Sequence, residues 1–392
     1  MLWVEDSRFA AFEGEHKDLS KWIVYVLGAF FVLGGVDYLI GNRLKLGEVF
    51  LETLKKMGVV CLGVLGIYSL APAAAGIVER GVGPLAQVLH MEPSIFPCML
   101  FPIDMGGYNL GVGIMQDEAL GMYAAIVISA ICGAGIGYTI PVSVTMIDKR
   151  HFPQLSLGLL SGVACIPIGC LVGSFLAGLP FLNTLWNLLP MTLLALLLVL
   201  GLWKKPGMMV KMFVVFGRIL SGISCVGLLL QGVKMIFGWE PIPGMAPLGE
   251  ALTIVCRIIF TMCGGMCLMA VLRRCFKGFM RAFGRRLRIG DAAVAGMLAS
   301  TVSVVIPFSD MDNLDKRGQV LVCAYAAGGA YVLGGQLGLA SELAPELIPA
   351  FVVAKLVAGI CGVCLAWLLL KNRKDIPDYR PEEKEESAHA SN

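Results

Sequence analysis

Residues 93–107, with the sequence PSIFPCMLFPIDMGG, hold the pattern that decides the fold. The segment is apolar enough to lie in a membrane, yet it contains Pro97, Pro102 and Asp104. Proline removes a backbone donor and interrupts a helix. A break inside a bilayer is tolerated only where protein or a water-filled cavity surrounds the freed backbone groups. The sequence therefore predicts a broken or re-entrant helix inside a larger helical membrane protein.

The composition of the whole chain indicates the same class of protein. Of its 392 residues, 57% are hydrophobic and 15% are charged, whereas soluble domains carry about 25% charged residues. A helix needs about 20 mostly apolar residues to cross a bilayer. We expect an all-α polytopic membrane protein of about 10–11 transmembrane or re-entrant helices. The candidate segments lie near 22–41, 57–78, 95–114, 119–145, 155–179, 186–203, 212–237, 250–272, 291–308, 319–340 and 346–370.

Polar segments flank this apolar part of the chain. Residues 1–21 are charged and do not resemble a cleavable signal sequence, and residues 371–392 carry too little apolar surface to fold alone. We therefore predict a polar N-terminal segment at 1–21, a transmembrane domain at 22–370 and a solvated tail at 371–392. The net charge of +3 and the scattered His and Cys residues predict no nucleic-acid partner, no metal site and no cofactor.

A short motif recurs along the chain. Ile140-Pro141-Val142-Ser143 in the first half is echoed in the second half by Ile306-Pro307-Phe308-Ser309. The recurrence predicts two internal repeats, roughly 42–203 and 204–370, with helix breaks at Pro102, Pro141 and Pro307. Repeats with interrupted helices are typical of secondary transporters, whose binding sites lie near the bilayer midplane. Five full spans in each repeat would make the repeats inverted, whereas the basic residues favour the same side for both, so both arrangements stay open.

Charged side chains inside the apolar segments are the first candidates for function, because their insertion costs about 2.5–3.5 kcal/mol each. They are Asp37, Asp104, Asp310 and Lys355. Asp104 lies between Pro102 and the glycine pair Gly106-Gly107, where a broken helix would place free carbonyl groups beside a carboxylate. An ammonium ion would find both partners there. The structural alternative is that Asp104 caps a helix or pairs with a basic side chain, and Lys355 is the candidate for that pairing.

Neutral side chains near the breaks complete the predicted site. Tyr108, Tyr138, Tyr325 and Tyr331 can offer ring faces to a cation. Ser143, Ser309 and Gln336 can hydrogen-bond to a hydroxyl group. The predicted substrate-binding residues are Asp104, Gly106, Gly107, Tyr108, Ser143, Ser309, Asp310 and Gln336.

Several of these segments resemble the EutH family of ethanolamine-utilisation transporters. The resemblance extends over almost the whole chain and rests on residues 93–107, Ile140-Pro141-Val142, IPIGC at 166–170, GWEPIPG at 238–244, Ile306-Pro307 and Lys355-Leu356. It implies a permease that brings protonated ethanolamine through the inner membrane of a bacterium. The chain departs from that family at Gly335-Gln336, where the family carries Asp-His, and at residues 309–312, where the family shows apolar and amide residues.

Other functions stay open at this point. A carrier or channel for another small amine or an amino acid would share these features. An intramembrane aspartyl protease would need two carboxylates that meet at a water molecule, and Arg288-Ile289-Gly290-Asp291 lacks the first glycine of the second protease motif. We therefore predict a transporter and not an enzyme, which works by alternating access around a midplane acidic site. The sequence leaves ion coupling and the oligomeric state open.

Overall fold

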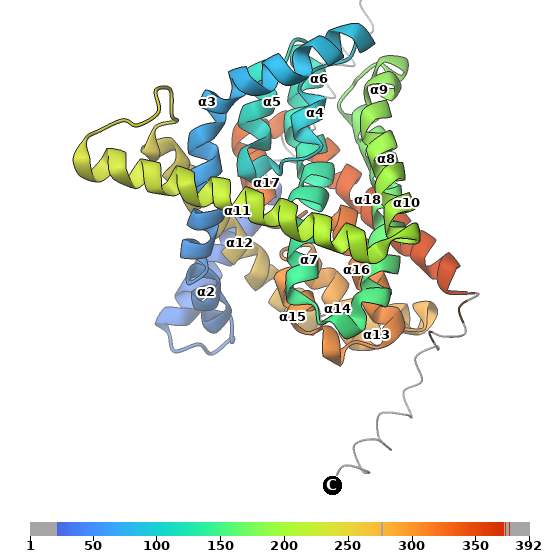
Figure 1. Ribbon diagram of the computed structural model, residues 1–392. Helices are drawn as coiled ribbons and strands as arrows, with labels where there is room; N and C mark the ends of the chain where they lie inside the picture. Colours follow the sequence, from blue (N-terminus) through green and yellow to red (C-terminus); the bar gives the residue numbers. More distant parts are fainter. Residues whose placement is uncertain (1–21, 276, 372, 374–375, 377–392) are drawn as a thin grey trace, which may run out of the picture.

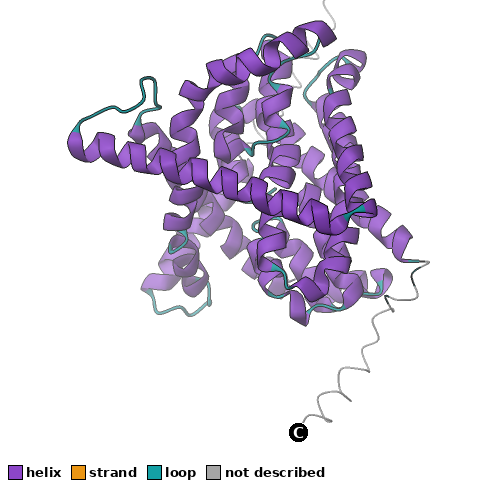
Figure 2. Cartoon of the chain, viewed as in Figure 1, coloured by secondary structure: helices purple, strands orange, loops and turns teal. Residues whose placement is uncertain are grey.

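The computed structural model describes residues 22–275, 277–371, 373 and 376, and their regular secondary structure is helical (Figures 1 and 2). The segment 1–21 and most of the predicted tail lie outside the described residues. Within the described part of the chain, seven helices are long and apolar enough to cross a bilayer. They are Trp22–Leu39, Val60–Leu89, Glu118–Met146, Lys149–Leu176, Gly207–Phe237, Leu248–Leu272 and Pro345–Leu370. The pair α9 (Phe181–Asn187) and α10 (Leu189–Lys204) would make an eighth span, bent by 44°.

Three of the expected apolar segments are broken into short helices. The first contains α4 (Ile95–Cys98), η1 (Ile103–Gly107) and α5 (Tyr108–Ile114). The second contains α14 (Asp291–Ser300) and α15 (Val305–Ser309), and the third α16 (Lys316–Gly329) and α17 (Gly335–Leu343). Together with the candidate spans, they account for the eleven stretches that hydropathy selects.

The core forms where α8 (Phe152–Leu176) packs against α16 and α18 (Ile348–Leu370). Glycine makes the close approach possible, because a Cβ on Gly162 would lie 2.5 Å from the Cβ of Ala327 in α16. A Cβ on Gly173 would lie 2.7 Å from the Cβ of Ala354 in α18. Small residues are the usual contacts between membrane helices, since lipid supplies no hydrophobic drive for association.

One span lies at the centre of the molecule. In the most apolar 18-residue stretch of Glu118–Met146, 89% of the residues are buried, compared with 17% in Trp22–Leu39 at the periphery. Its sections are α6 (Glu118–Tyr123), η2 (Ala124–Gly133), η3 (Gly135–Thr139) and α7 (Ile140–Met146), and both η2 and η3 are π-helical. We call Glu118–Met146 the central helix.

The central helix continues through Pro141, so the helix break predicted there is not present. The π turns that precede Pro141 are wider than α turns and give its ring room that an α turn would deny. Pro307, by contrast, lies in the five-residue helix α15, after a break at residues 301–304. The two Ile-Pro motifs, at 140–141 and 306–307, therefore occupy different structural settings.

The remaining helices surround this core. They are α2 (Gly47–Leu54), α3 (Met57–Leu89), α11 (Pro206–Phe237), α12 (Leu248–Cys275) and α13 (Lys277–Leu287), with short 3-10 turns η4 (Lys149–His151), η5 (Met311–Asn313) and η6 (Pro345–Leu347). Helix α11 crosses the face of the molecule that is nearest in Figure 1 and packs against α3. Helix α17 packs against η1, so the second half of one broken segment meets the break of another.

Candidate functional site

The backbone beside Asp104 is not helical. Pro102 is extended (φ −58°, ψ 151°), and Gly106 has a φ of +88° that side chains other than glycine rarely adopt. The backbone N–H groups of Met105 and Gly107 both donate to the carbonyl of Pro102, over 3.0 and 2.9 Å. A tight non-helical loop thus carries Asp104, and the predicted break at Pro102 is present.

The carbonyl that this break frees finds a partner on the central helix. The hydroxyl of Ser129, in η2, donates to the carbonyl oxygen of Phe101 over 2.9 Å. A buried backbone carbonyl without such a partner would cost free energy. The contact fixes the break to the most buried helix of the molecule.

Asp104 is joined to Lys355 through Gln336. The amide Nε2 of Gln336 donates to Oδ1 of Asp104 over 3.3 Å, and its Oε1 accepts from Nζ of Lys355 over 2.8 Å. Lys355 and Gln336 are 1% and 4% exposed, whereas Asp104 is half-buried. Asp104 is therefore the least buried residue of these three.

The ammonium group of Lys355 has a second oxygen ligand and two aromatic neighbours. Its Nζ donates to the carbonyl of Ala330 over 2.7 Å and lies 5.1 Å and 5.7 Å from the ring centroids of Phe351 and Tyr331. Ala330 is extended (φ −69°, ψ 155°) at the end of α16. Its carbonyl is available because α16 ends at Gly329, so two helix breaks meet at this cluster.

A second tyrosine extends the cluster toward the central helix. The rings of Tyr138, in η3, and Tyr331 meet edge to face with centroids 5.9 Å apart. Both tyrosines are half-buried. We call Asp104, Gln336, Lys355, Tyr138 and Tyr331 the polar cluster. It offers a carboxylate, an amide and ring faces, which are the groups that bind a small ammonium ion.

Three predicted site residues lie away from the polar cluster. Ser143 donates to the carbonyl of Ile140, in its own helix, over 2.7 Å. Ser309 donates to the carbonyl of Ile306 over 2.9 Å, and Asp310 accepts from Nδ2 of Asn313 over 2.5 Å. Ser309 and Asp310 are exposed at one end of the helical bundle. Gly106 and Gly107 belong to the loop of Asp104, and Tyr108 is the half-buried first residue of α5.

The other charged candidate, Asp37, has a structural role. Its carboxylate accepts hydrogen bonds from the backbone N–H groups of Leu44, Leu46 and Gly47, over 2.8, 2.8 and 2.9 Å. These bonds close the turn between the first span and α2, and satisfy N–H groups at the start of that helix.

One end of the bundle carries a network of ion pairs. The carboxylate of Asp312 lies 2.5 Å from Nη2 of Arg150 and 2.6 Å from Nε2 of His151. The hydrogen bond from His151, together with the positive charge of Arg150, holds the pKa of Asp312 below its usual value. The contact joins the loop before α16 to η4, which lies before α8.

Among the described residues, no group of three or more His, Cys, Asp and Glu side chains could hold a metal ion.

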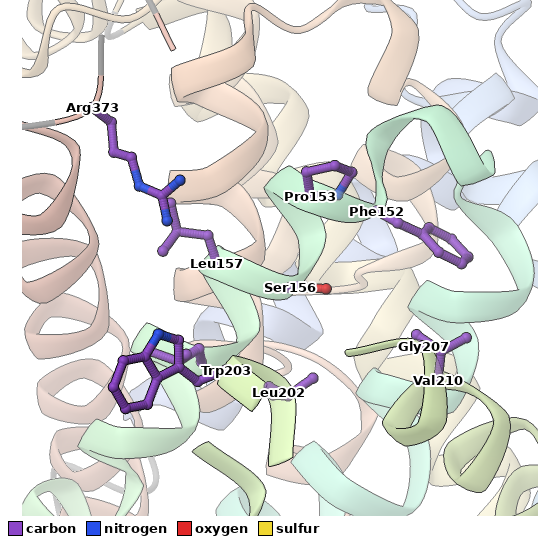
Figure 3. A pocket seen from close by; sticks show the side chains of 10 residues that line it. Phe152, Pro153, Ser156, Leu157, Leu202, Trp203, Gly207, Val210 and Arg373 are labelled. Carbon is purple, nitrogen blue, oxygen red and sulfur yellow. The ribbon is translucent and has the colours of Figure 1, made fainter. Parts of the chain in front are cut away.

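A separate cavity of about 380 Å³ lies between α8, α10 and α11 (Figure 3). Its wall is mostly apolar, including Leu157, Leu202 and Trp203, with Ser156 and Arg373 as its polar members. It contains none of the predicted site residues. Among the described residues, its lining offers no carboxylate to an ammonium ion, and the polar cluster is the candidate site.

Sequence reasoning missed Ala330, Phe351 and Ser129 as parts of this site. Ala330 contributes only its backbone carbonyl, and Phe351 and Ser129 lie in apolar helices where such residues usually only pack. Neither feature is visible in a sequence. Gly328-Gly329 just before Ala330 was the one available indication, because paired glycines can mark the end of a helix.

Comparison with known proteins gives the family. The family model for "Ethanolamine utilisation protein, EutH" matches residues 19–369. The "Probable ethanolamine permease EutH" of Listeria monocytogenes is 34% identical over 91% of this chain and 95% of its own length. The protein of that name from Salmonella typhimurium is 29% identical, over 90% and 96%. An uncharacterized protein of Bacillus subtilis, YxeR, is 32% identical over 88% and 94%.

No solved structure matches the chain. The relatives that carry a functional name are named as permeases, which implies a transporter and not an enzyme. The match covers the candidate spans and the polar cluster together. The chain is thus a multi-pass membrane protein that belongs to the EutH family of ethanolamine utilisation proteins.

Proposed function

We propose that this protein takes up protonated ethanolamine through the plasma membrane of a bacterium, with Asp104 as the partner of the substrate ammonium group. The observation that carries the proposal is the carboxylate of Asp104, which lies on a helix break and accepts a hydrogen bond from Gln336. The names of its relatives support ethanolamine as the substrate.

The chemistry of the polar cluster fits that substrate. Ethanolamine near neutral pH is a small ammonium ion with one hydroxyl group. Asp104 would bind the ammonium group, the rings of Tyr138 and Tyr331 would lie beside it, and the amide of Gln336 would bind the hydroxyl group. Gly106, Gly107 and Tyr108 would shape the loop around the substrate. Ser143, Ser309 and Asp310 are outside this proposed contact set.

Two broken helices meet at the polar cluster, which favours alternating access around a midplane site. The distribution of charge supports an orientation for this movement. Basic residues gather at the end of the bundle that carries η4 and α13, including Lys149, Arg150, Arg285 and Arg286. By the positive-inside rule, that end faces the cytoplasm.

Uptake of labelled ethanolamine into proteoliposomes tests the role of Asp104. We expect Asp104→Asn to lower uptake at low substrate concentration by at least about 100-fold, because a buried ion pair that loses one partner costs about 3–5 kcal/mol. The matched control is Asp310→Asn, which changes an exposed carboxylate and leaves uptake within about twofold.

Equal uptake by both variants would remove Asp104 from the site. Uptake of a different amine but not of ethanolamine by the wild-type protein would show that the substrate is wrong. Competition by propylamine and by amino acids separates these two alternatives.

A further inference from the structure

Lys355 has contacts that go beyond those of a packed lysine. Its Nζ has two oxygen ligands, at 2.7 and 2.8 Å, and lies near two aromatic rings, so the protein holds its charge in place. Only the amide of Gln336 lies between this charge and Asp104. A positive and a negative charge are thus linked in the membrane interior without direct contact.

The charges in this arrangement change when a substrate binds. In the empty site, Asp104 and Lys355 together carry no net charge. A protonated amine at Asp104 adds one positive charge. An unpaired carboxylate inside a bilayer is costly. In the loaded site the substrate ammonium pairs with Asp104, while Lys355 keeps the carbonyl of Ala330 and its two ring faces. In the empty site Asp104 depends on Lys355 for its compensating charge while the site changes the side to which it opens.

We propose that Lys355 is the internal counter-charge of the empty carrier. Its ammonium group, acting through the Gln336 amide, compensates Asp104 while no substrate is bound and so allows the empty site to return across the membrane. The proposal rests on the function proposed above. It assigns Lys355 a positioning and charge-compensating role and not a contact with the substrate.

A consequence is that uptake needs no sodium ion and no proton as a partner. Each ethanolamine would carry one elementary charge inward, and a membrane potential of about 100 mV would then support an accumulation of about 50-fold.

Lys355→Gln separates the loaded step from the empty step. In exchange, labelled ethanolamine enters as unlabelled ethanolamine leaves, so only the loaded carrier moves. In net uptake, the carrier must also return empty, and in this variant it returns with an unpaired Asp104. We expect exchange to persist and the ratio of net uptake to exchange to fall at least about tenfold at about pH 7.5.

Acidification provides the second measurement. Protonation of Asp104 removes the unpaired charge, so the net uptake of Lys355→Gln should recover toward the wild-type ratio at about pH 5.5. The other ionisable groups beside the pair are Tyr138, Tyr331 and Cys170, and phenols and thiols stay essentially neutral in this pH range. Lys355→Arg keeps the positive charge and should keep the ratio within about threefold.

The ratio does not depend on how much protein reaches the membrane. An unchanged ratio in Lys355→Gln would overturn the role of Lys355 while leaving ethanolamine transport intact. Loss of exchange together with net uptake in Lys355→Gln, with Lys355→Arg active, would show that Lys355 acts on the loaded site and would also overturn it. Absence of exchange in the wild-type protein would contradict the proposed function itself.

A second inference rests on different observations, namely the ends of the helices. Helix α3 ends at Leu89 and is followed by His90 with a φ of +52°, and α13 ends at Leu287 and is followed by Arg288 with a φ of +59°. Beyond each, a backbone N–H bonds five positions back, from Met91 to Ala86 and from Ile289 to Gly284. The two helix ends therefore match in both backbone angle and hydrogen bonding.

The helices that follow these two helix ends, the central helix and α16, also begin alike. Their first residues are separated by as many positions as His90 and Arg288 are. Asp117 precedes the central helix and accepts a hydrogen bond from the N–H of Leu120. Asp315 precedes α16 and accepts one from the N–H of Gly318. Both are N-caps of helices that follow a broken segment. The step from Asp117 to Asp315 equals the step from His90 to Arg288.

Helices α8 and α18 form the last matching pair. Their first residues, Phe152 and Ile348, are separated by two positions fewer than His90 and Arg288 are. The 3-10 turn η4 leads into α8, which begins Phe152-Pro153, and the 3-10 turn η6 leads into α18, which begins Ile348-Pro349. These two helices run in opposite directions. A Cβ on Gly362 would lie 3.0 Å from the Cα of Gly162, and Gly173, later in α8, faces Ala354, earlier in α18.

From these correspondences we infer that residues 57–176 and 248–370 are two inverted repeats. The register pairs position 90 with 288 and position 152 with 348, and does not pair the Ile-Pro motif at 140 with the one at 306. In this register the break that carries Asp104 corresponds to the break at residues 301–304, where Val302 takes the place of Asp104. The acidic group is thus present in one repeat only, on a scaffold whose halves can exchange conformations.

Labelling of single cysteines with a membrane-impermeant thiol reagent tests the inversion. Glu118→Cys and Lys316→Cys change the exposed first residues of two equivalent helices, and we expect them to react from opposite faces of the membrane. Lys149→Cys should react from the same face as Lys316→Cys, and Pro345→Cys from the face of Glu118→Cys. Each is scored against a parent chain whose own cysteines are replaced.

Saturating ethanolamine adds a functional measurement. Exchange of conformations between inverted halves opens one face as it closes the other, so labelling at Lys149→Cys and at Pro345→Cys should change in opposite directions. Reaction of Glu118→Cys and Lys316→Cys from the same face would overturn the inverted arrangement. If ethanolamine changed the labelling of Lys149→Cys and Pro345→Cys in the same direction, the proposed exchange of conformations between the two halves would be wrong.

Discussion

At the scale of single residues, the position of the Asp104 carboxylate depends on Gly106. The φ of Gly106 is +88°, and a Cβ there would lie 2.6 Å from Cγ2 of Ile67 in α3. The positive φ disfavours any residue with a Cβ, and the short distance to Ile67 leaves no room for one. The loop can therefore present Asp104 only while glycine occupies this position.

Gly106→Ala should consequently destabilise the protein. The left-handed backbone costs a residue with a Cβ about 1–2 kcal/mol, and the overlap with Ile67 adds to it. The control is Gly76→Ala in α3, where a Cβ meets nothing within 4 Å. Alanine in a helix interior is favoured over glycine by about 0.5–1 kcal/mol, so this control should be neutral or stabilising. Thermal unfolding in detergent, with uptake measured in parallel, compares the two, and equal melting temperatures would contradict the assignment.

Sequence reasoning selected Asp104, Gln336 and Lys355 because polar groups in apolar segments need a partner, and their role in substrate binding stays a prediction. The three were selected separately, and the structure joins them in one hydrogen-bonded chain. Ser143 and Ser309 were selected by the same reasoning, yet each bonds a carbonyl in its own helix turn. A sequence cannot distinguish these outcomes, since a serine in a helix always has such a carbonyl within reach.

At the scale of elements, Asp312 joins the loop before α16 to the turn before α8. It pairs with Arg150 and His151, which lie in η4. The pairing is exposed, so its contribution to stability is small and sensitive to salt.

The lowered pKa of Asp312 gives the pairing a predictable pH dependence. A carboxyl whose pKa is lower in the folded protein than in the unfolded chain stabilises the fold above the unfolded pKa, about 3.9. That contribution disappears as pH falls through the lower, folded value. Asp312→Asn should therefore lower the melting temperature slightly at about pH 6 and by less at about pH 3. In a chain that already carries Arg150→Gln and His151→Gln, the substitution should have no effect at either pH, and a persistent difference would contradict the pairing.

Elements were harder to predict where the backbone departs from α geometry. The break at Pro102 follows from proline chemistry, but the same chemistry suggested a break at Pro141, where the helix continues through π turns. Wider turns upstream accommodate the ring, and no residue type marks a π turn in a sequence.

At the scale of the whole molecule, hydropathy selected eleven apolar segments, because the bilayer sets the length of a span. Among the described residues, seven of them form single candidate spans, one forms the bent pair α9 and α10, and three are broken into short helices. Hydropathy did not give the relation between the halves. The Ile-Pro motif is a match of a few letters, whereas the correspondences that relate α3 to α13 and α8 to α18 lie in helix ends whose residues differ, such as His90 and Arg288. Backbone geometry keeps this relation after the side chains have changed.

The π turns of the central helix show how the two halves have diverged in length. The stretch from Asp117 to Phe152 is longer by two positions than the stretch from Asp315 to Ile348, which is why the offset between the halves falls by two. A π turn holds one residue more than an α turn, and the central helix has two π-helical stretches, η2 and η3. On the proposed register, two single-residue insertions after a gene duplication would leave this pattern, each absorbed as a local widening of the central helix.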